Sequence, residues 1–91
     1  KFKDINSRKL LRIVVGKLKS NNYAVGNIDA TIICESPKMQ PYINQMTENI
    51  SNDCLCDLNN INIKATTTEK LGFIGRSEGI AAQAICLIKV V

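Results

Sequence analysis

Histidine and tryptophan are both absent from this chain of 91 residues, and only four of its side chains are aromatic. Without histidine the chain offers neither the Ser–His or Cys–His pairing of nucleophilic catalysis nor an imidazole ligand for a metal ion. The few aromatic residues do not interleave with the basic stretch near the N-terminus, so the stacking platforms typical of nucleic-acid binders are missing. We therefore interpret the net charge of +4 as a solvated helix face and expect no nucleic-acid partner.

Long apolar runs are also missing, because no stretch reaches the roughly 18 residues that indicate a membrane-spanning helix. We therefore expect no membrane partner. The four cysteines include one C-x-C pair, Cys54 and Cys56, which without a second pair or a histidine lacks the spacing of a zinc site. Their sparse placement also disfavours a disulfide framework. Cys34 and Cys86, each beside apolar residues, are expected to be small core residues in a reducing compartment.

Hydrophobic periodicity predicts helix, strand, helix, strand, turn and strand, in that order. Asn6 or Ser7 is expected to cap the first helix, which ends at Asn21-Asn22. The alternation of polar and apolar residues from Tyr23 to Cys34 predicts a half-buried strand with a bulge at Gly26. The buried stripe of the first helix is expected to comprise Leu10, Leu11, Val14, Val15 and Leu18.

The second half of the chain begins with another helix, whose start is bracketed by Pro37 and Pro41. A loop is expected around Asp53 to Asn60, and a strand at 61–65 follows it. The small and apolar residues from Gly79 to Val91 fit either a buried helix or a strand. The buried stripe of the second helix is expected to comprise Tyr42, Ile43, Met46 and Ile50.

The segment from Lys64 to Gly79 carries most of the chemistry. Three adjacent threonines, a carboxylate and an arginine suit a phosphorylated ligand and its counter-ion. A helical turn is expected at 69–71, where free backbone N–H groups could hold an anion. Because Glu69 would repel a bare phosphate, we expect a magnesium ion between the two. An alternative stays open, in which Thr66 or Thr67 merely caps that helix with Glu69 as its capping-box partner.

Three motifs resemble one enzyme family: KATTTEKLGFxGRxEGIAAQA from Lys64, GNxDATII from Gly26 and the tripeptide PKM from Pro37. Over nearly its whole length the chain resembles the 2-C-methyl-D-erythritol 2,4-cyclodiphosphate synthase family of the non-mevalonate isoprenoid pathway. The resemblance implies an α+β fold, with a mixed β-sheet packed on one face by helices and the sheets facing the centre of a homotrimer. It also favours a strand over a helix for Gly79 to Val91.

The resemblance further implies that residues 1–91 form a single partial domain, the C-terminal portion of a cyclodiphosphate synthase-like domain. The family's zinc site uses an Asp-x-His pair and a further histidine, and these have no counterpart in this chain. We therefore expect the zinc ligands in an N-terminal portion outside this sequence, and we expect the fragment alone to be inactive. The alternative is a non-catalytic module that binds nucleotide or forms the trimer.

Site residues are implied by the resemblance position by position. The cytidine end of the substrate is expected in the loop from Cys34 to Gln40 and against Ala65 to Thr68. Thr67 matches the catalytic residue assigned to transition-state stabilisation, and Glu69 matches the ligand of a magnesium or manganese ion that bridges the phosphates. The implied substrate-binding residues are Cys34, Pro37, Lys38, Met39, Ala65, Thr66, Thr67, Thr68, Glu69, Phe73 and Arg76.

Two of these positions lie toward the far end of the substrate. Phe73 and Arg76 match positions beside the methylerythritol group and the inner cavity of the trimer, where Arg76 could meet an isoprenoid diphosphate. For Arg76 an intersubunit salt bridge is the alternative. Asp29 is interpreted as structural, because a carboxylate inside a strand more often satisfies the backbone or a lysine.

The implied reaction is an intramolecular phosphoryl transfer within a cytidine diphosphate-linked small molecule. In it, 4-diphosphocytidyl-2-C-methyl-D-erythritol 2-phosphate gives 2-C-methyl-D-erythritol 2,4-cyclodiphosphate and CMP. Such a reaction needs positioning and charge neutralisation rather than a nucleophilic side chain. The expected cofactors are divalent metals, zinc together with magnesium or manganese. The expected location is the bacterial cytoplasm or the stroma of a plastid such as the apicoplast.

Overall fold

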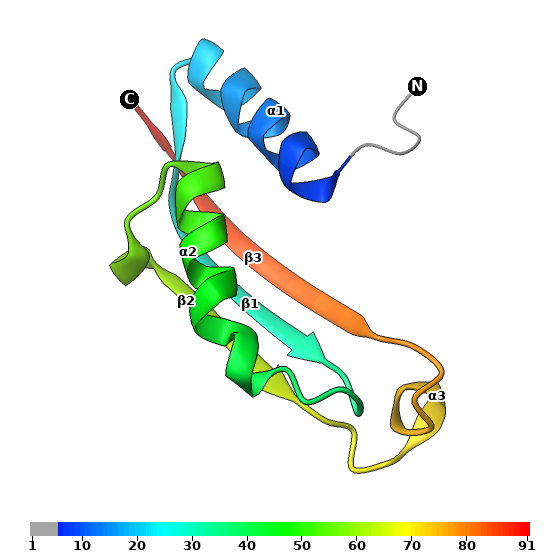
Figure 1. The fold of residues 1–91 in the computed structure, drawn as a ribbon. Helices are drawn as coiled ribbons and strands as arrows, with labels where there is room; N and C mark the ends of the chain where they lie inside the picture. The colour runs from blue at the N-terminus through cyan, green and yellow to red at the C-terminus, as the bar shows by residue number, and fades with distance from the viewer. Residues whose placement is uncertain (1–5) are drawn as a thin grey trace.

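Two long helices lie on one face of a three-stranded sheet in the computed structural model, which describes residues 6–91 (Figure 1). The helices and strands are α1 (Ser7–Ser20), β1 (Tyr23–Ile33), α2 (Ile43–Cys54), β2 (Ile61–Thr66), α3 (Gly72–Gly75) and β3 (Ala81–Val90). Short 3₁₀ turns at Gln40–Tyr42 and Leu58–Asn60 precede α2 and β2. This arrangement confirms the expected α+β class, with a mixed sheet packed on one face by helices. No helix formed by residues 6–91 is long and apolar enough to cross a membrane.

Strand β1 lies in the middle of the sheet, parallel to β2 and antiparallel to β3. Its pairing with β3 shifts between Val25 and Asn27, which confirms the bulge expected at Gly26. A Cβ atom at Gly26 would lie 3.2 Å from the carbonyl oxygen of Leu87, so glycine permits the close approach of the two backbones there. The existence of β3 also confirms the strand that the resemblance favoured for the C-terminal segment.

The hydrophobic core lies between the sheet and the two long helices. Because strand side chains alternate, the bulge brings Val25 and Ile28 to the same face of β1. Helix α1 begins where the side chain of Asn6 accepts a hydrogen bond from the N–H of Arg8 at 2.8 Å, and it buries Val15 against that face. The core residues are Val15, Val25, Cys54, Cys56, Ile61 and Ile63, with Leu11, Leu18, Ile28, Ala30, Ile32, Ile43, Met46 and Ile50 partly buried around them.

Three residues expected in the core are exposed instead, namely Val14, Tyr42 and Cys86. Helix α1 packs on β1 and α2 packs on β2, so neither covers β3 to the same extent. Cys86 pairs with Ile28 across the sheet but lies on this uncovered edge strand, and its predicted burial is therefore wrong. Cys34 is buried as expected. All four cysteines are free thiols, and burial raises the pKa of Cys54 and of Cys56.

Asp53 is a buried charge that holds α1 against α2. Its side chain, only 2% exposed, accepts hydrogen bonds from Nε and Nη2 of Arg8 at 2.7 and 3.0 Å and from Nη1 of Arg12 at 3.0 Å. These bonds, first the one from Arg8, hold the pKa of the Asp53 carboxyl below its usual range. The predicted loop therefore begins later than expected, since Asp53 belongs to the last turn of α2. The basic face of α1 is also not simply solvated, because both arginines are paired.

Candidate functional site

Two loops leave the carboxyl ends of adjacent parallel strands, at the end of the sheet where α3 also lies (Figure 1). The first loop, residues 34–39, follows β1, and the second, residues 67–71, follows β2. The N–H of Cys34 donates to the carbonyl oxygen of Thr66 at 3.1 Å, which ties the two loops together at their starts. In open sheets that contain parallel strands, ligands characteristically bind outside the carboxyl ends of those strands.

A pocket of about 80 Å³ opens between these loops, and we call it the interloop pocket. Its lining residues are Cys34, Lys38, Met39, Gln40, Ala65, Thr66 and Thr67. The two segments expected to hold the nucleotide are thus brought together, although they lie far apart in the sequence. Pro37, Thr68 and Glu69 belong to the same two loops but do not line the pocket.

The side chain of Cys34 holds the first loop compact. The Cys34 thiol donates to the carbonyl oxygens of Ser36 at 3.3 Å and Pro37 at 3.5 Å, and the Ser36–Pro37 peptide bond is cis. The side chain of Lys38 follows this bend, exposed at the pocket, and supplies a positive charge there. The loop can therefore offer backbone polar groups and one cation to an anionic ligand.

The three threonine hydroxyls differ in whether they can still donate a hydrogen bond to a ligand. Thr67 Oγ1 accepts from the N–H of Glu69 at 3.3 Å, so its own proton stays available for a ligand. Thr68 Oγ1 donates to the carbonyl oxygen of Leu71 at 2.7 Å, so its proton is committed. Thr66 Oγ1 makes a long contact, 3.4 Å, with the carbonyl oxygen of Thr67. Of the three, Thr67 combines a free proton with a place in the pocket wall.

The helical turn expected at 69–71 is not formed. Glu69 and Lys70 have φ angles of 54° and 64°, in the left-handed region, and the helical residues of α3 begin only at Gly72. The residue that precedes α3 is Leu71, which makes no side-chain capping bond. The capping-box interpretation of Thr66 or Thr67 with Glu69 is therefore wrong, as is the expectation of a helix start at this point. Each left-handed residue costs about 1–2 kcal/mol, so the turn needs other contacts to hold it.

Phe73 and Arg76 are not brought to the interloop pocket by the fold of this chain. Phe73 is exposed and lies against Gly79, where a Cβ atom would be 3.0 Å from its ring. The Arg76 guanidinium pairs with both carboxylate oxygens of Glu78 at 3.1 Å. These contacts close the α3 segment on itself, so the structure leaves the expected ligand contacts of both residues as predictions.

Asp29 has the structural role expected of it. Its Oδ1 accepts from Nζ of Lys64 at 2.8 Å across the parallel pair β1–β2, on the face of the sheet away from the helices. Both side chains are about half exposed, so the pair is a surface ion pair of little stabilising value.

Glu35 is the residue at this site that sequence reasoning missed. Its Oε1 accepts from the backbone N–H of Lys70 at 2.7 Å, and its Oε2 is buried with no hydrogen-bond partner among residues 6–91. No local pattern signals a contact between positions 35 residues apart, and the only sequence hint was a carboxylate directly after a buried strand.

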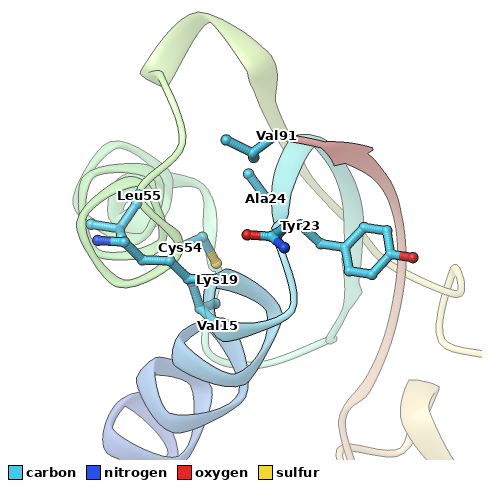
Figure 2. A pocket seen from close by; sticks show the side chains of 8 residues that line it. Val15, Lys19, Tyr23, Ala24, Cys54, Leu55 and Val91 are labelled. Atoms are coloured by element: carbon cyan, nitrogen blue, oxygen red, sulfur yellow. The ribbon is translucent and has the colours of Figure 1, made fainter.

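A larger cavity, of about 380 Å³, lies where β1 begins and β3 ends (Figure 2). Figure 2 shows Leu55 and Val91 among its lining residues, with the ring of Tyr23 directed away from both. Lys19 is its one charged side chain, and none of the expected site residues lines it. Size alone therefore does not make it the better candidate, because a specific site needs several convergent polar groups.

A family model settles the relationship of this chain to known proteins, because the YgbB family matches residues 1–89. The chain belongs to the YgbB family. Among curated relatives, the 2-C-methyl-D-erythritol 2,4-cyclodiphosphate synthase of Methylobacillus flagellatus is 57% identical over 89 residues, which are 98% of this chain and 56% of that protein. The chain thus spans about half the length of the curated relatives it matches.

Two solved structures share the fold of this chain. The bifunctional IspDF of Campylobacter jejuni is 41% identical with a TM-score of 0.93, over 100% of this chain and 25% of that one. IspF of Plasmodium falciparum, described as a CDP complex, is 32% identical with a TM-score of 0.84, over 93% of this chain and 54% of that one.

Of the metals expected from the resemblance, the described residues fit magnesium or manganese but not zinc. Within residues 6–91, no three His, Cys, Asp or Glu side chains lie together as a metal site, so these residues do not fit zinc. Glu69 is exposed at the head of the left-handed turn. Its single carboxylate fits magnesium or manganese, since magnesium is usually bound through one or two carboxylates and the phosphates of a substrate.

Proposed function

We propose that the protein containing this chain is a 2-C-methyl-D-erythritol 2,4-cyclodiphosphate synthase. It would convert 4-diphosphocytidyl-2-C-methyl-D-erythritol 2-phosphate into 2-C-methyl-D-erythritol 2,4-cyclodiphosphate and CMP. The observation that carries the proposal is the interloop pocket, which joins the two segments expected to bind cytidine in a chain of the YgbB family. The relatives that bear the synthase name support it.

The interloop pocket would be one wall of the nucleotide site. Its volume of about 80 Å³ is well below the roughly 300–1,000 Å³ usual for ligand pockets, so further residues must complete it. Backbone groups of the first loop would recognise the cytosine, and Lys38 would neutralise a phosphate. Ala65 and Thr66 would lie along the nucleotide from the other side. The CDP complex of a structure 32% identical to this chain favours a cytidine ligand.

In the proposed reaction the 2-phosphate attacks the β-phosphorus and CMP leaves. The chain's task is to hold the two phosphates in line and to balance their charge, for which no nucleophilic side chain is needed. The Thr67 hydroxyl would donate a hydrogen bond to the charge that develops on the transferred phosphoryl group. Glu69 would hold magnesium or manganese, and that ion would neutralise part of the negative charge of the phosphates. Zinc enters no step here, because the described residues do not fit it.

We further propose a homotrimer in which the face of the sheet away from α1 and α2 points to the centre. Apolar residues exposed on β3, among them Ile85 and Leu87, support burial against other copies. Phe73 and Arg76 would then reach the methylerythritol end and the trimer cavity, where an isoprenoid diphosphate could bind Arg76. A monodisperse monomer in light scattering of the full-length protein at micromolar concentration would contradict the trimer.

For the location of the protein we propose a bacterial cytoplasm or a plastid stroma.

Competition between nucleotides tests the proposal. A fluorescent CDP analogue bound to the full-length protein should be displaced by CMP and CDP, and far less by UMP or AMP, because backbone groups match one base. Lys38→Met should weaken this binding, whereas Lys9→Met on α1 should not. Equal displacement by UMP or AMP would contradict the pocket assignment. Selective binding without any turnover would instead favour a non-catalytic nucleotide-binding module.

A further inference from the structure

Glu35 connects the two loops that border the interloop pocket, although it does not line the pocket itself. Its Oε1 accepts from the N–H of Lys70 at 2.7 Å, and its Oε2 has almost no exposed surface. A charge-assisted hydrogen bond of this length is stronger than a bond between neutral groups. The carboxylate is therefore enclosed between the loops and bound to the backbone of the second one.

The backbone that Glu35 binds is a turn in an unfavourable conformation. Glu69 and Lys70 are consecutive left-handed residues, and neither is glycine. Each has its N–H bound by a side chain: Thr67 Oγ1 accepts from Glu69 at 3.3 Å and Glu35 accepts from Lys70. Such conformations persist only where the surroundings hold them. The bond to Glu35 is the shorter of the two and comes from outside the loop.

Gly75 packs closely against the backbone of the same turn. A Cβ atom at this position would lie 2.1 Å from the carbonyl carbon of Lys70, so only glycine leaves room for the Lys70 backbone there. Lys70 is thus bound at its N–H by the Glu35 carboxylate, while its carbonyl group lies in space that only a residue without a side chain at position 75 leaves open. A turn bound at the Lys70 N–H and closely packed against Gly75 restricts the direction in which the Glu69 side chain leaves it.

We infer that Glu35 is a positioning residue, which through the N–H of Lys70 sets the Glu69 carboxylate and the Thr67 hydroxyl relative to the interloop pocket. Its catalytic consequence rests on the proposed function, because Glu69 and Thr67 are the residues given roles there. The claim that Glu35 holds the turn does not rest on it, because the hydrogen bond between Glu35 and the N–H of Lys70 can be measured without any substrate.

Three variants of the full-length protein test the inference. Glu35→Ala removes the acceptor, whereas Glu35→Gln keeps an acceptor oxygen at the same reach without the charge. Glu48→Ala removes an exposed carboxylate on α2 and is the matched control. In Glu35→Ala we expect the Lys70 amide to exchange roughly 10- to 100-fold faster by NMR, and kcat to fall by a similar factor with KM little changed. Glu35→Gln should keep the Lys70 exchange rate and kcat close to those of the wild type. Glu48→Ala should change neither quantity.

Two results would overturn the inference. One is an unchanged exchange rate of the Lys70 amide in Glu35→Ala. The other is an equal loss of kcat in Glu35→Ala and Glu35→Gln, which would mean that the charge of Glu35 matters and its hydrogen bond does not. If Glu35→Ala does not fold, Glu35→Asp gives the same test, because it withdraws the oxygen by one methylene and keeps the charge. A wild-type protein without turnover would overturn the proposed function alone. The Lys70 exchange rates would still decide whether Glu35 holds the turn.

Discussion

Gly75→Ala should damage the site more than its small size suggests. The new Cβ atom would lie 2.1, 2.6 and 2.7 Å from the carbonyl carbon, Cα and carbonyl oxygen of Lys70. Cβ atoms are essentially never found closer than 3.0 Å to an atom of a residue that is not a chain neighbour, so the backbones of positions 70 and 75 must move apart by about 0.9 Å. Helix propensity predicts the opposite sign, because replacing a helical glycine with alanine ordinarily stabilises by about 1 kcal/mol.

A displacement of this size at the turn moves Glu69, and misplacement of about 1 Å can cost on the order of 100-fold in rate. We therefore expect kcat to fall by roughly that factor while the melting temperature changes little, since α3 contributes no buried residue. Gly16→Ala on α1 is the control, because a Cβ atom there meets nothing within 4 Å. That variant should keep its turnover and gain a little stability. Wild-type turnover in Gly75→Ala would refute the reasoning.

The remaining predictions concern the ligand-facing residues and the buried ion pair. Glu69→Gln keeps the shape but removes the charge that attracts the metal, so turnover should fall by roughly 100-fold or more and recover in part at high magnesium; a magnesium titration without recovery would contradict this. Thr67→Val should lower kcat roughly 10- to 1,000-fold without rescue by magnesium, and unchanged kcat would argue against its role. For Asp53, the lowered pKa in the folded state means that its stabilisation is present above the unfolded value of about 3.9 and is lost as pH falls through the folded value. Urea midpoints should therefore drop more steeply below about pH 4 in the wild type than in Asp53→Asn, and parallel curves would contradict the assignment.

Local sequence patterns correctly predicted the elements whose structure depends on residues close by in the sequence. Asn6 caps α1, a bulge interrupts β1 at Gly26, and the helix expected near Pro37 and Pro41 is formed as α2, all as the sequence indicated. The motifs also identified two distant loops that the fold does bring to one pocket. Parallel pairing of β1 with β2 explains this success, because it places both carboxyl ends at the same edge of the sheet.

Prediction failed where contacts between distant segments decide. The sequence Thr67 to Leu71 is typical of a helix start, yet its backbone forms a left-handed turn in which the distant Glu35 side chain binds the N–H of Lys70. Asp53 seemed to begin a loop because its arginine partners lie on another helix, more than 40 positions earlier. Cys86 has a core-like composition around it, but the edge position of β3 leaves it exposed.

The most direct measurement is a ³¹P NMR time course of the purified full-length protein with 4-diphosphocytidyl-2-C-methyl-D-erythritol 2-phosphate and magnesium. We expect the signals of the substrate diphosphate and monophosphate to be replaced by those of a cyclic diphosphate and CMP in equal amounts. Thr67→Val and Glu69→Gln should slow this conversion, whereas Glu48→Ala should not. A folded, metal-loaded protein that binds CDP but releases no CMP from this substrate would contradict the proposed synthase.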